Sequence, residues 1–341
     1  MSELQLKDLY DGFRDPDVIK ALAKAIRDEA KNLKEPLNIM EVCGGHTHTI
    51  MKYGLKQLLP QNIDFIHGPG CPVCIMPKER IDHAIALAQM EDTILLTLGD
   101  MIRVPGSKSS LAVERANGCD IRALYSPLDA IKIAREHPDK KVVFFAIGFE
   151  TTTPMTAALL EQVEKQSITN LYFHINHVLV PPAVDAIMAD GQAKINAFIG
   201  PAHVSVISGA KIYQPLPEKY GAPVVVSGFE PIDVLQSILM IVRQKNEARC
   251  EMEIQYSRSV TLEGNMKAQD MIAKFMEPRE HFRWRGIGDI PDSALVLREQ
   301  YASYDAEKIF ADMLPTDPID DHKLCICGPI LKGLAKPNDC Q

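Results

Sequence analysis

Short apolar runs rich in β-branched residues alternate along this chain with longer stretches in which apolar residues recur at helical spacing. This alternation is the pattern of a parallel β-sheet whose strands are joined by crossover helices. The runs predict strands over Leu37–Val42, Ile63–Ile66, Thr93–Leu98, Ile121–Tyr125, Val142–Ile147, Leu171–Ile175, Ala197–Ile199 and Val224–Val226. The stretches between them predict helices that include Lys78–Gln89, Pro127–Glu136, Pro154–Lys165, Pro182–Ala189 and Pro231–Lys245.

The chain is therefore predicted to be an α/β protein with two Rossmann-like parallel-sheet domains and a smaller, less regular C-terminal domain. The tripeptide Gly-Phe-Glu occurs at 148–150 and again at 228–230, each time after an apolar strand and before a helix that opens with Pro. This repetition suggests that the chain contains two similar α/β halves. After Ser259 the alternation weakens, and Pro and Gly recur between short helical patterns. The expected domain bounds are 1–140, 141–258 and 259–341.

Composition narrows the classes of partner and the compartment. The 341 residues carry a formal net charge of −8, and no basic run offsets it, so neither nucleic acid nor an anionic membrane surface is an expected partner. The longest apolar runs are far shorter than the roughly 20 residues of a membrane-spanning helix, and the N-terminus has no secretory apolar stretch. We therefore expect a cytoplasmic protein, where its eight cysteines stay reduced and serve metal or redox chemistry.

The polar motifs fall directly after predicted strands, at the edge of the sheet where α/β proteins bind ligands. The first is Cys-Gly-Gly-His-Thr-His at 43–48. Gly44 and Gly45 would let the backbone approach a ligand closely. A lone thiol is most often a small buried hydrophobe, but this context favours Cys43 as a metal ligand or nucleophile. His46 or His48 could complete or tune that site, or be ordinary hydrogen-bonded loop residues.

The second motif, His-Gly-Pro-Gly-Cys-Pro-Val-Cys at 67–74, follows the second strand. The spacing of Cys71 and Cys74 lets the two sulfurs reach each other or one metal, and a following helix N-terminus would lower a thiol pKa. We therefore predict a redox pair. The alternative is half of a structural zinc site, for which a matching second pair is not evident nearby.

Two further sites stand out. Glu150 lies where a strand gives way to a helix, so its carboxylate could move protons or simply favour the helix start.

Cys325, Cys327 and Cys340 bring three thiols into a short C-terminal stretch. This density is typical of an iron–sulfur or zinc site, although one ligand is missing. Cys119 and Cys250 lack such context and are read as structural. Phosphate-binding loops of the nucleotide-binding types are absent from the sequence.

These motifs together make the chain recognisable, because residues 41–48 followed by 67–74 resemble the HypD family of nickel–iron hydrogenase maturation factors. The resemblance continues through Arg103-Val104-Pro105-Gly106, Tyr125-Ser126-Pro127, Gly148-Phe149-Glu150-Thr151-Thr152, Gly200-Pro201-Ala202-His203-Val204, Gly228-Phe229-Glu230-Pro231 and Trp284-Arg285-Gly286-Ile287-Gly288. It covers nearly the whole chain in the family's order.

The resemblance implies a scaffold rather than a free-standing metabolic enzyme. In this family the protein pairs with the small chaperone HypC to hold iron while cyanide and carbon monoxide are attached, giving the Fe(CN)2CO moiety, and HypE delivers the cyanide. By resemblance, Cys43 is the iron ligand or near-ligand shared with a HypC cysteine. Cys71 and Cys74 match the redox pair, and His46 and Glu150 match positions near that centre.

The resemblance also implies a 4Fe-4S iron–sulfur cluster in the C-terminal region that exchanges electrons with the dithiol, with Cys325, Cys327 and Cys340 as its expected metal ligands here. Family members continue past the position of Cys340 with a tail holding further cysteines, whereas this sequence stops at Gln341.

Two other functions fit the residues. One is a general thiol-disulfide oxidoreductase that uses Cys71 and Cys74. The other is a zinc-dependent hydrolase built on His46, His48 and Glu150.

Overall fold

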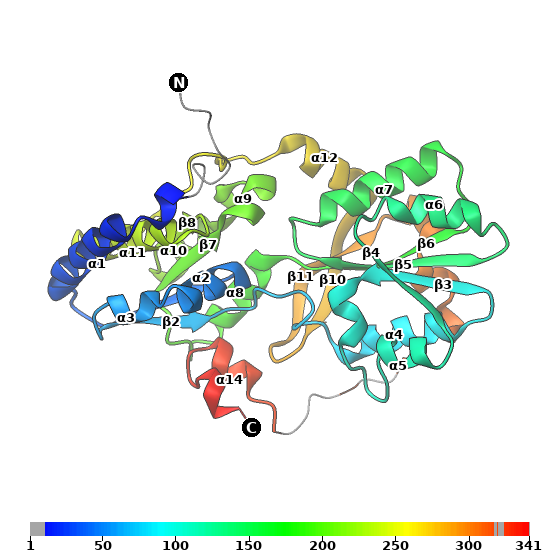
Figure 1. Cartoon of the computed structure of the whole chain (residues 1–341), viewed down its shortest axis with the longest axis horizontal. Coiled ribbons are helices and arrows are strands. Elements are labelled where there is room, and N and C mark those ends of the chain that lie inside the picture. Colours follow the sequence, from blue (N-terminus) through cyan, green and yellow to red (C-terminus); the bar gives the residue numbers. More distant parts are fainter. Residues whose placement is uncertain (1–10, 317–318, 320–323, 341) are drawn as a thin grey trace. The chain divides into compact units, whose positions relative to one another are not determined.

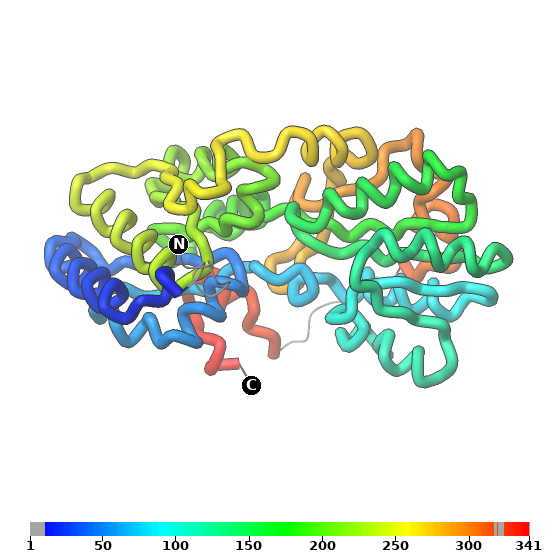
Figure 2. The backbone as a smooth tube through the Cα atoms, turned by 45° about the horizontal axis from the view of Figure 1, so that its top comes forward, coloured from blue at the N-terminus to red at the C-terminus, as the bar shows by residue number. Residues whose placement is uncertain are grey.

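The computed structural model describes residues 11–316, 319 and 324–340, and the chain divides into two compact units. Unit 1 contains residues 1–70, 184–266 and 328–341, and unit 2 contains residues 71–183 and 267–327. Each unit is therefore assembled from segments that are separated in the sequence. Figures 1 and 2 trace this path.

Unit 1 is built on a five-stranded sheet in the order β2-β1-β7-β8-β9, with every neighbouring pair parallel. Its strands are β1 (Leu37–Glu41), β2 (Ile63–His67), β7 (Ala197–Pro201), β8 (Val224–Ser227) and β9 (Met252–Ile254). Its helices are α1 (Pro16–Glu29), α2 (Gly44–Lys52), α3 (Leu55–Leu58), α9 (Ala202–Ser208), α10 (Pro215–Tyr220) and α11 (Pro231–Asn246).

Local signals explain where the main helices of unit 1 begin. In α1 the Asp15 side chain accepts hydrogen bonds from the N–H groups of Asp17 and Val18, and Pro16 occupies the first turn. In α11 Glu230 and Asp233 form a reciprocal capping box. Helices α1 and α11 lie side by side (Figure 1) and help bury an apolar core.

Unit 2 is built on a four-stranded parallel sheet in the order β4-β3-β5-β6. Its strands are β3 (Thr93–Leu98), β4 (Asp120–Leu124), β5 (Lys141–Gly148) and β6 (Leu171–His177). Its helices include α4 (Lys78–Gln89), α5 (Leu111–Ala116), α6 (Asp129–Glu136), α7 (Thr153–Lys165) and α13 (Ala306–Ile309). Seven of the eight β5 residues are buried, as expected of a central parallel strand covered on both faces.

An antiparallel hairpin of β10 (Met276–Trp284) and β11 (Gly288–Leu297) packs against β6 within unit 2. Figure 2 shows helix α12 (Met266–Phe275, yellow) leading into the hairpin (orange). The chain passes between the units after residues 70, 183, 266 and 327. The last three of these points lie in helices α8 (Val180–Ala189), α12 and α14 (Cys327–Leu331).

A buried charged cluster anchors the start of α4, three residues after the Cys71 to Cys74 loop. The Arg80 guanidinium donates to the Glu307 carboxylate at 2.6 and 3.1 Å, to Asn176 Oδ1 at 2.6 Å and to the Ile175 carbonyl at 2.9 Å. Arg279 also pairs with Glu307, at 2.6 Å. Burial alone would raise the pKa of Glu307, but the two guanidinium groups hold that pKa well below its ordinary value.

The α/β prediction is confirmed, and all eight predicted strands and all five named helices occur with ends within two residues of those predicted. The stretch after 259 is more regular than predicted because it contains the hairpin. Charged residues such as Glu277, Arg279 and Arg283 and the prolines at 278 and 291 interrupt the apolar pattern there. The predicted bounds of 1–140, 141–258 and 259–341 cut the chain into consecutive pieces, whereas the compact units interleave.

Within the described part of the chain, every helix is too short or too polar to cross a bilayer.

The Arg80 cluster predicts a large stability difference between two similar substitutions. Arg80→Met removes one partner of a buried ion pair, so we expect the free energy of unfolding to fall by about 3 kcal/mol. Lys132→Met removes an exposed pair with Glu136 and should cost about 0.5 kcal/mol or less. Chemical denaturation of both variants measures this difference. Equal small losses would show that the buried cluster does not stabilise unit 2.

Candidate functional site

The predicted site residues divide between the two units. Cys43, Gly44, Gly45, His46, His48 and Cys340 belong to unit 1, whereas Cys71, Cys74, Glu150, Cys325 and Cys327 belong to unit 2. Each group is described below within its own unit.

In unit 1, Cys43 occupies the junction between β1 and α2. Its extended backbone (φ −145°, ψ 130°) makes it the N-cap of α2, and its sulfur accepts the Gly45 N–H at 3.4 Å. The same sulfur lies 3.9 Å from Nε2 of His203, which is the second residue of α9. A thiolate and an imidazole at this separation could both reach one metal ion, since metal–sulfur and metal–nitrogen bonds are about 2.3 and 2.0 Å long.

The ring of His46, on α2, packs against the loop that carries Gly228 and Phe229, and its predicted role at the centre stays a prediction. Its ring is fully buried, its Nε2–H donates to the Gly228 carbonyl at 3.0 Å, and it stacks on Phe229 with ring centroids 4.5 Å apart. Burial lowers the pKa of His46 to about 4, so the ring is neutral at pH 7. Phe229 also contacts the His203 ring, at 5.0 Å. Gly228 and Phe229 of the second Gly-Phe-Glu tripeptide thus contact His46, three residues after Cys43.

The remaining residues of the first motif differ in their surroundings. An added Cβ at Gly45 would come within 2.8 Å of the Phe229 ring, so close packing requires glycine there, whereas the space around Gly44 is open. His48 is exposed on α2. The role of His48, Gly44 and Gly45 in binding a cofactor stays a prediction.

Glu41, the last residue of β1, organises the loop that carries Cys43. Its carboxylate is 1% exposed and accepts three hydrogen bonds: from Cys43 N–H at 3.2 Å, from the Thr47 hydroxyl, and from His67 Nδ1 at 2.5 Å. Burial raises the pKa of Glu41, against the lowering effect of the His67 and Thr47 hydrogen bonds. The sequence places His203 directly after a strand, but neither His203 nor Glu41 was predicted as a site residue. The position of each at the end of a strand is the signal that could have identified it.

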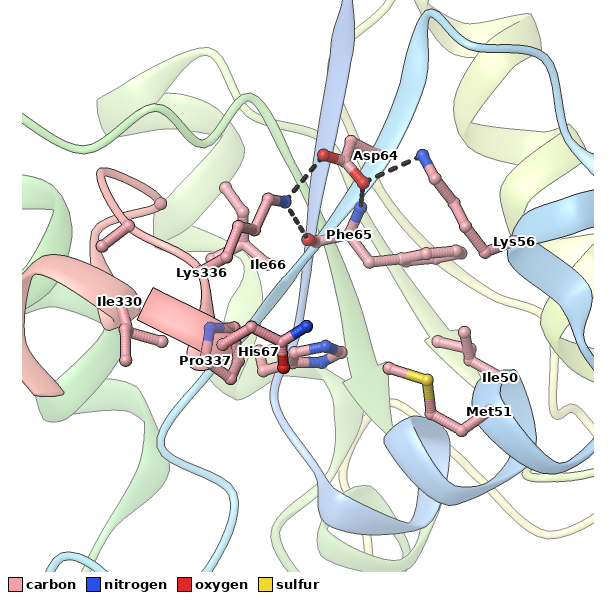
Figure 3. Close-up of a pocket in the computed structure, with 13 residues that line it drawn as sticks. Ile50, Met51, Lys56, Asp64, Phe65, Ile66, His67, Ile330, Lys336 and Pro337 are labelled. Atoms are coloured by element: carbon pink, nitrogen blue, oxygen red, sulfur yellow. Dashed lines mark hydrogen bonds and ion pairs between the residues drawn. The ribbon is translucent and has the colours of Figure 1, made fainter. Parts of the chain in front are cut away.

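A cavity of about 280 Å³ opens beside this network in unit 1. Figure 3 shows the His67 ring in the cavity beside Pro337, with Ile50 and Met51 of α2 on another side. Lys56 and Lys336 both pair with Asp64, at 2.9 and 2.7 Å. The C-terminal residues 330–338 therefore complete a pocket on β2.

In unit 2, Cys71 and Cys74 form a tight turn. The N–H of Cys74 donates to Cys71 Sγ at 3.2 Å and is also near the Cys71 carbonyl, at 3.1 Å. The hydrogen bond from the Cys74 thiol, together with the backbone N–H groups of Cys74 and Val73, lowers the pKa of Cys71 to about 6. The same pairing raises the pKa of Cys74, with Arg285 opposing the rise. Of the two thiols, Cys71 is therefore the one that loses its proton more readily.

Glu150 lies in unit 2, after β5. It is buried, and one carboxyl oxygen accepts the Val180 N–H at 2.8 Å, while the other has no hydrogen-bond partner among the described residues. Burial raises the pKa of Glu150 to about 7. The neighbouring Phe149 packs against Trp284 of the hairpin, with ring centroids 6.2 Å apart. Glu150 can therefore hold a proton near neutral pH.

The C-terminal cysteines do not form a complete metal site among the described residues. A 4Fe-4S cluster is held by four thiolates, and the described part of the chain contains no group of three or more His, Cys, Asp or Glu side chains arranged for a metal. Cys327 does interact electrostatically with Cys74 in unit 2. The cluster at Cys325, Cys327 and Cys340 stays a prediction, and no step below involves it.

The fold and these residues define a class: an α/β protein that carries a cysteine–histidine pair at one parallel sheet and a Cys-x-x-Cys turn in the other unit. A family model named HypD, described as "Hydrogenase formation hypA family", matches residues 17–341. The chain belongs to the HypD family of hydrogenase maturation factors.

Individual relatives agree with this assignment. The chain is 50% identical to "Hydrogenase maturation factor HypD2" of Bradyrhizobium diazoefficiens and 49% identical to "Hydrogenase maturation factor HypD" of Azotobacter vinelandii. It is 43% identical to the HypD of Escherichia coli. The first two alignments cover 97% of this chain and 88% of the relative, and the third covers 97% and 89%.

The dithiol geometry predicts a pH profile for alkylation of Cys71. In the native protein its rate of reaction with iodoacetamide should reach half of its maximum near pH 6. Cys74→Ala removes the largest cause of the lowered pKa, so the midpoint should move upward toward that of an ordinary thiol, about 8.5. Peptide-level mass spectrometry from pH 5 to 9 measures both. A midpoint above 8 in the native protein would contradict this geometry.

Buried Glu150 predicts a pH-dependent contribution to stability. Its folded-state pKa of about 7 exceeds the ordinary value of 4.5, so between these pH values the folded state binds the extra proton. Stability should therefore fall by about 3 kcal/mol as pH rises from about 4.5 to 7. In Glu150→Gln this contribution should be absent, and Glu161→Gln, on the surface of α7, should keep it. Denaturation curves from pH 4.5 to 8 test the difference; parallel profiles for all three proteins would contradict it.

Proposed function

We propose that this chain is a scaffold for metal-ligand assembly in hydrogenase maturation. Together with a small HypC-type chaperone it holds iron, as substrate, while cyanide and carbon monoxide are attached to give Fe(CN)2CO, and a HypE-type protein delivers the cyanide. The observation that carries this proposal is the 3.9 Å approach of Cys43 Sγ to His203 Nε2 in a member of the HypD family.

The donor set suits iron that carries diatomic ligands. Thiolate and imidazole both bind iron well, and a backbone N–H on the sulfur is the kind of outer contact that tunes a metal-bound thiolate. This chain contributes at most two ligands at that centre. The proposal assigns the remaining positions to the chaperone's cysteine, to cyanide and to carbon monoxide.

The dithiol is assigned the redox role. When Cys71 and Cys74 form a disulfide, the pair gives up two electrons to the iron-ligand assembly. Near neutral pH it also releases about one proton, from Cys74, because Cys71 with a pKa of about 6 is already mostly thiolate. Within unit 1, Gly70 packs against the backbone of Cys43, since an added Cβ at Gly70 would lie 2.5 Å from Cys43 Cα. The proposal sets this work in the cytoplasm, where thiols stay reduced.

Infrared spectroscopy of the chain purified with its HypC partner tests this function. Under conditions in which the hydrogenase matures, we expect cyanide and carbonyl bands and bound iron. Cys43→Ala should lower both by at least about 10-fold, because outer contacts alone contribute 10- to 100-fold to metal affinity. Cys250→Ala is the matched control, since that thiol donates to the Pro217 carbonyl at 3.6 Å and lies outside the cysteine motifs.

The same variants separate the alternatives. A general thiol-disulfide oxidoreductase would keep its activity in Cys43→Ala and lose it in Cys71→Ser. A zinc hydrolase would contain one zinc per chain in place of iron. A native complex without cyanide or carbonyl bands would reject the scaffold.

A further inference from the structure

The buried Glu41 carboxylate is chemically out of place in the strand that bears it. The neighbouring Ile39 and Met40 of β1 are fully buried and apolar, and Leu37 is buried as well. Removing a carboxylate from water is strongly unfavourable unless hydrogen bonds and charges compensate. An apolar residue would satisfy the sheet at lower cost, so this departure from the local pattern points to a role other than stability.

The three hydrogen bonds of Glu41 hold both sides of Cys43. One carboxyl oxygen accepts the Cys43 N–H at 3.2 Å, which orients the peptide just before the thiol. The other accepts the hydroxyl of Thr47 in the first turns of α2, which follows the thiol. A single rigid group therefore sets the angle between strand and helix at the position of the cysteine.

His67 holds the carboxylate itself. It ends β2 and is the direct partner of Glu41 in the parallel register, and its Nδ1 lies 2.5 Å from the carboxyl oxygen. The next residues close over the same strand end: Gly68 N–H donates to the Glu41 carbonyl at 2.8 Å, and Gly70 lies against the Cys43 backbone. Glu41 is consequently fixed from the neighbouring strand.

We propose that Glu41 is a positioning residue that aims the Cys43 thiol at His203. It acts through the Cys43 N–H and the Thr47 hydroxyl and does not itself bind the metal. This inference rests on the proposed function only in giving Cys43 the role of iron ligand. The role is geometric, so hydrogen bonding, rather than the negative charge, is what Glu41 must supply.

Glutamine separates geometry from charge at this position. In Glu41→Gln the amide oxygen can still accept the Cys43 N–H. The amide N–H groups can donate to the Thr47 oxygen and to the unprotonated Nδ1 of His67, because both of those atoms also act as acceptors. Glu41→Ala removes all of these contacts.

The test is the rate at which iodoacetamide alkylates Cys43 in the metal-free protein, measured by peptide-level mass spectrometry relative to Cys119 and Cys250 in the same sample. In Glu41→Ala the thiol is released from its place between the Gly45 N–H and His203, so we expect its relative rate to rise about fivefold, the effect of losing one net hydrogen bond. Glu41→Gln should stay within about twofold of the native rate, as should the matched control Glu114→Gln, which alters a buried carboxylate bonded to Ser109 and Gln89 in unit 2.

An unchanged Cys43 rate in folded Glu41→Ala, or a Glu41→Gln rate equal to that of Glu41→Ala, would overturn the proposal. If Glu41→Ala does not fold, Thr47→Val replaces it and should raise the Cys43 rate at least twofold, since it removes only the helix-side contact; no change there would likewise overturn it. The readout requires no iron. Failure of the scaffold function would appear as missing infrared bands with the alkylation pattern intact, so the two failures are distinguishable.

Discussion

Parallel pairing of β1 with β7 and of β7 with β8 is the constraint on which the first site depends. Because parallel strands present their carboxyl ends at one edge, this pairing brings together the loops after Glu41, Pro201 and Ser227. Cys43 and Phe229 lie in the connections after β1 and β8, and His203 lies in the first turn of α9, directly after β7. Residues 158 positions apart, such as Glu41 and Ile199, are register partners, and the contact of Cys43 Sγ with His203 follows from this register.

The polar groups at the strand ends differ in their contacts and in how burial shifts their pKa values. His46 is neutral and bonded to a backbone carbonyl, so it supports the loop that carries Phe229. Glu150 in unit 2 has half of its carboxyl group without a hydrogen-bond partner among the described residues, and burial raises its pKa. The two Gly-Phe-Glu tripeptides both follow a buried strand, but the strands are not equivalent, since β5 corresponds in sheet order to β7 and not to β8. Their glutamates also differ, because Glu230 caps α11 and pairs with Arg14.

Hydrophobic periodicity predicted the strands and helices of both parallel sheets because buried parallel strands are nearly continuous apolar runs. It missed the β10–β11 hairpin, whose exposed face carries charged residues, and it could not reveal that segments distant in the chain form one unit. Motif position identified Cys43, Cys71 and Cys74 as chemically special. It could not distinguish His46, which is buried, from His48, which is exposed, because that difference depends on which face of α2 meets residues 228–229. The role of Glu41 could not be predicted for a similar reason, because its partner His67 lies on another strand.

The interleaved path of the chain also bears on its synthesis. Strand β1 gains β2 as a neighbour early, but its other edge stays open until β7 has been made, about 130 residues after β2 ends (67 to 197). At about 5–20 residues per second a ribosome needs roughly ten seconds for that interval. During that time an apolar strand edge next to Cys43 remains open to aggregation. A nascent chain of this topology is therefore a substrate for chaperones that cover exposed strand edges.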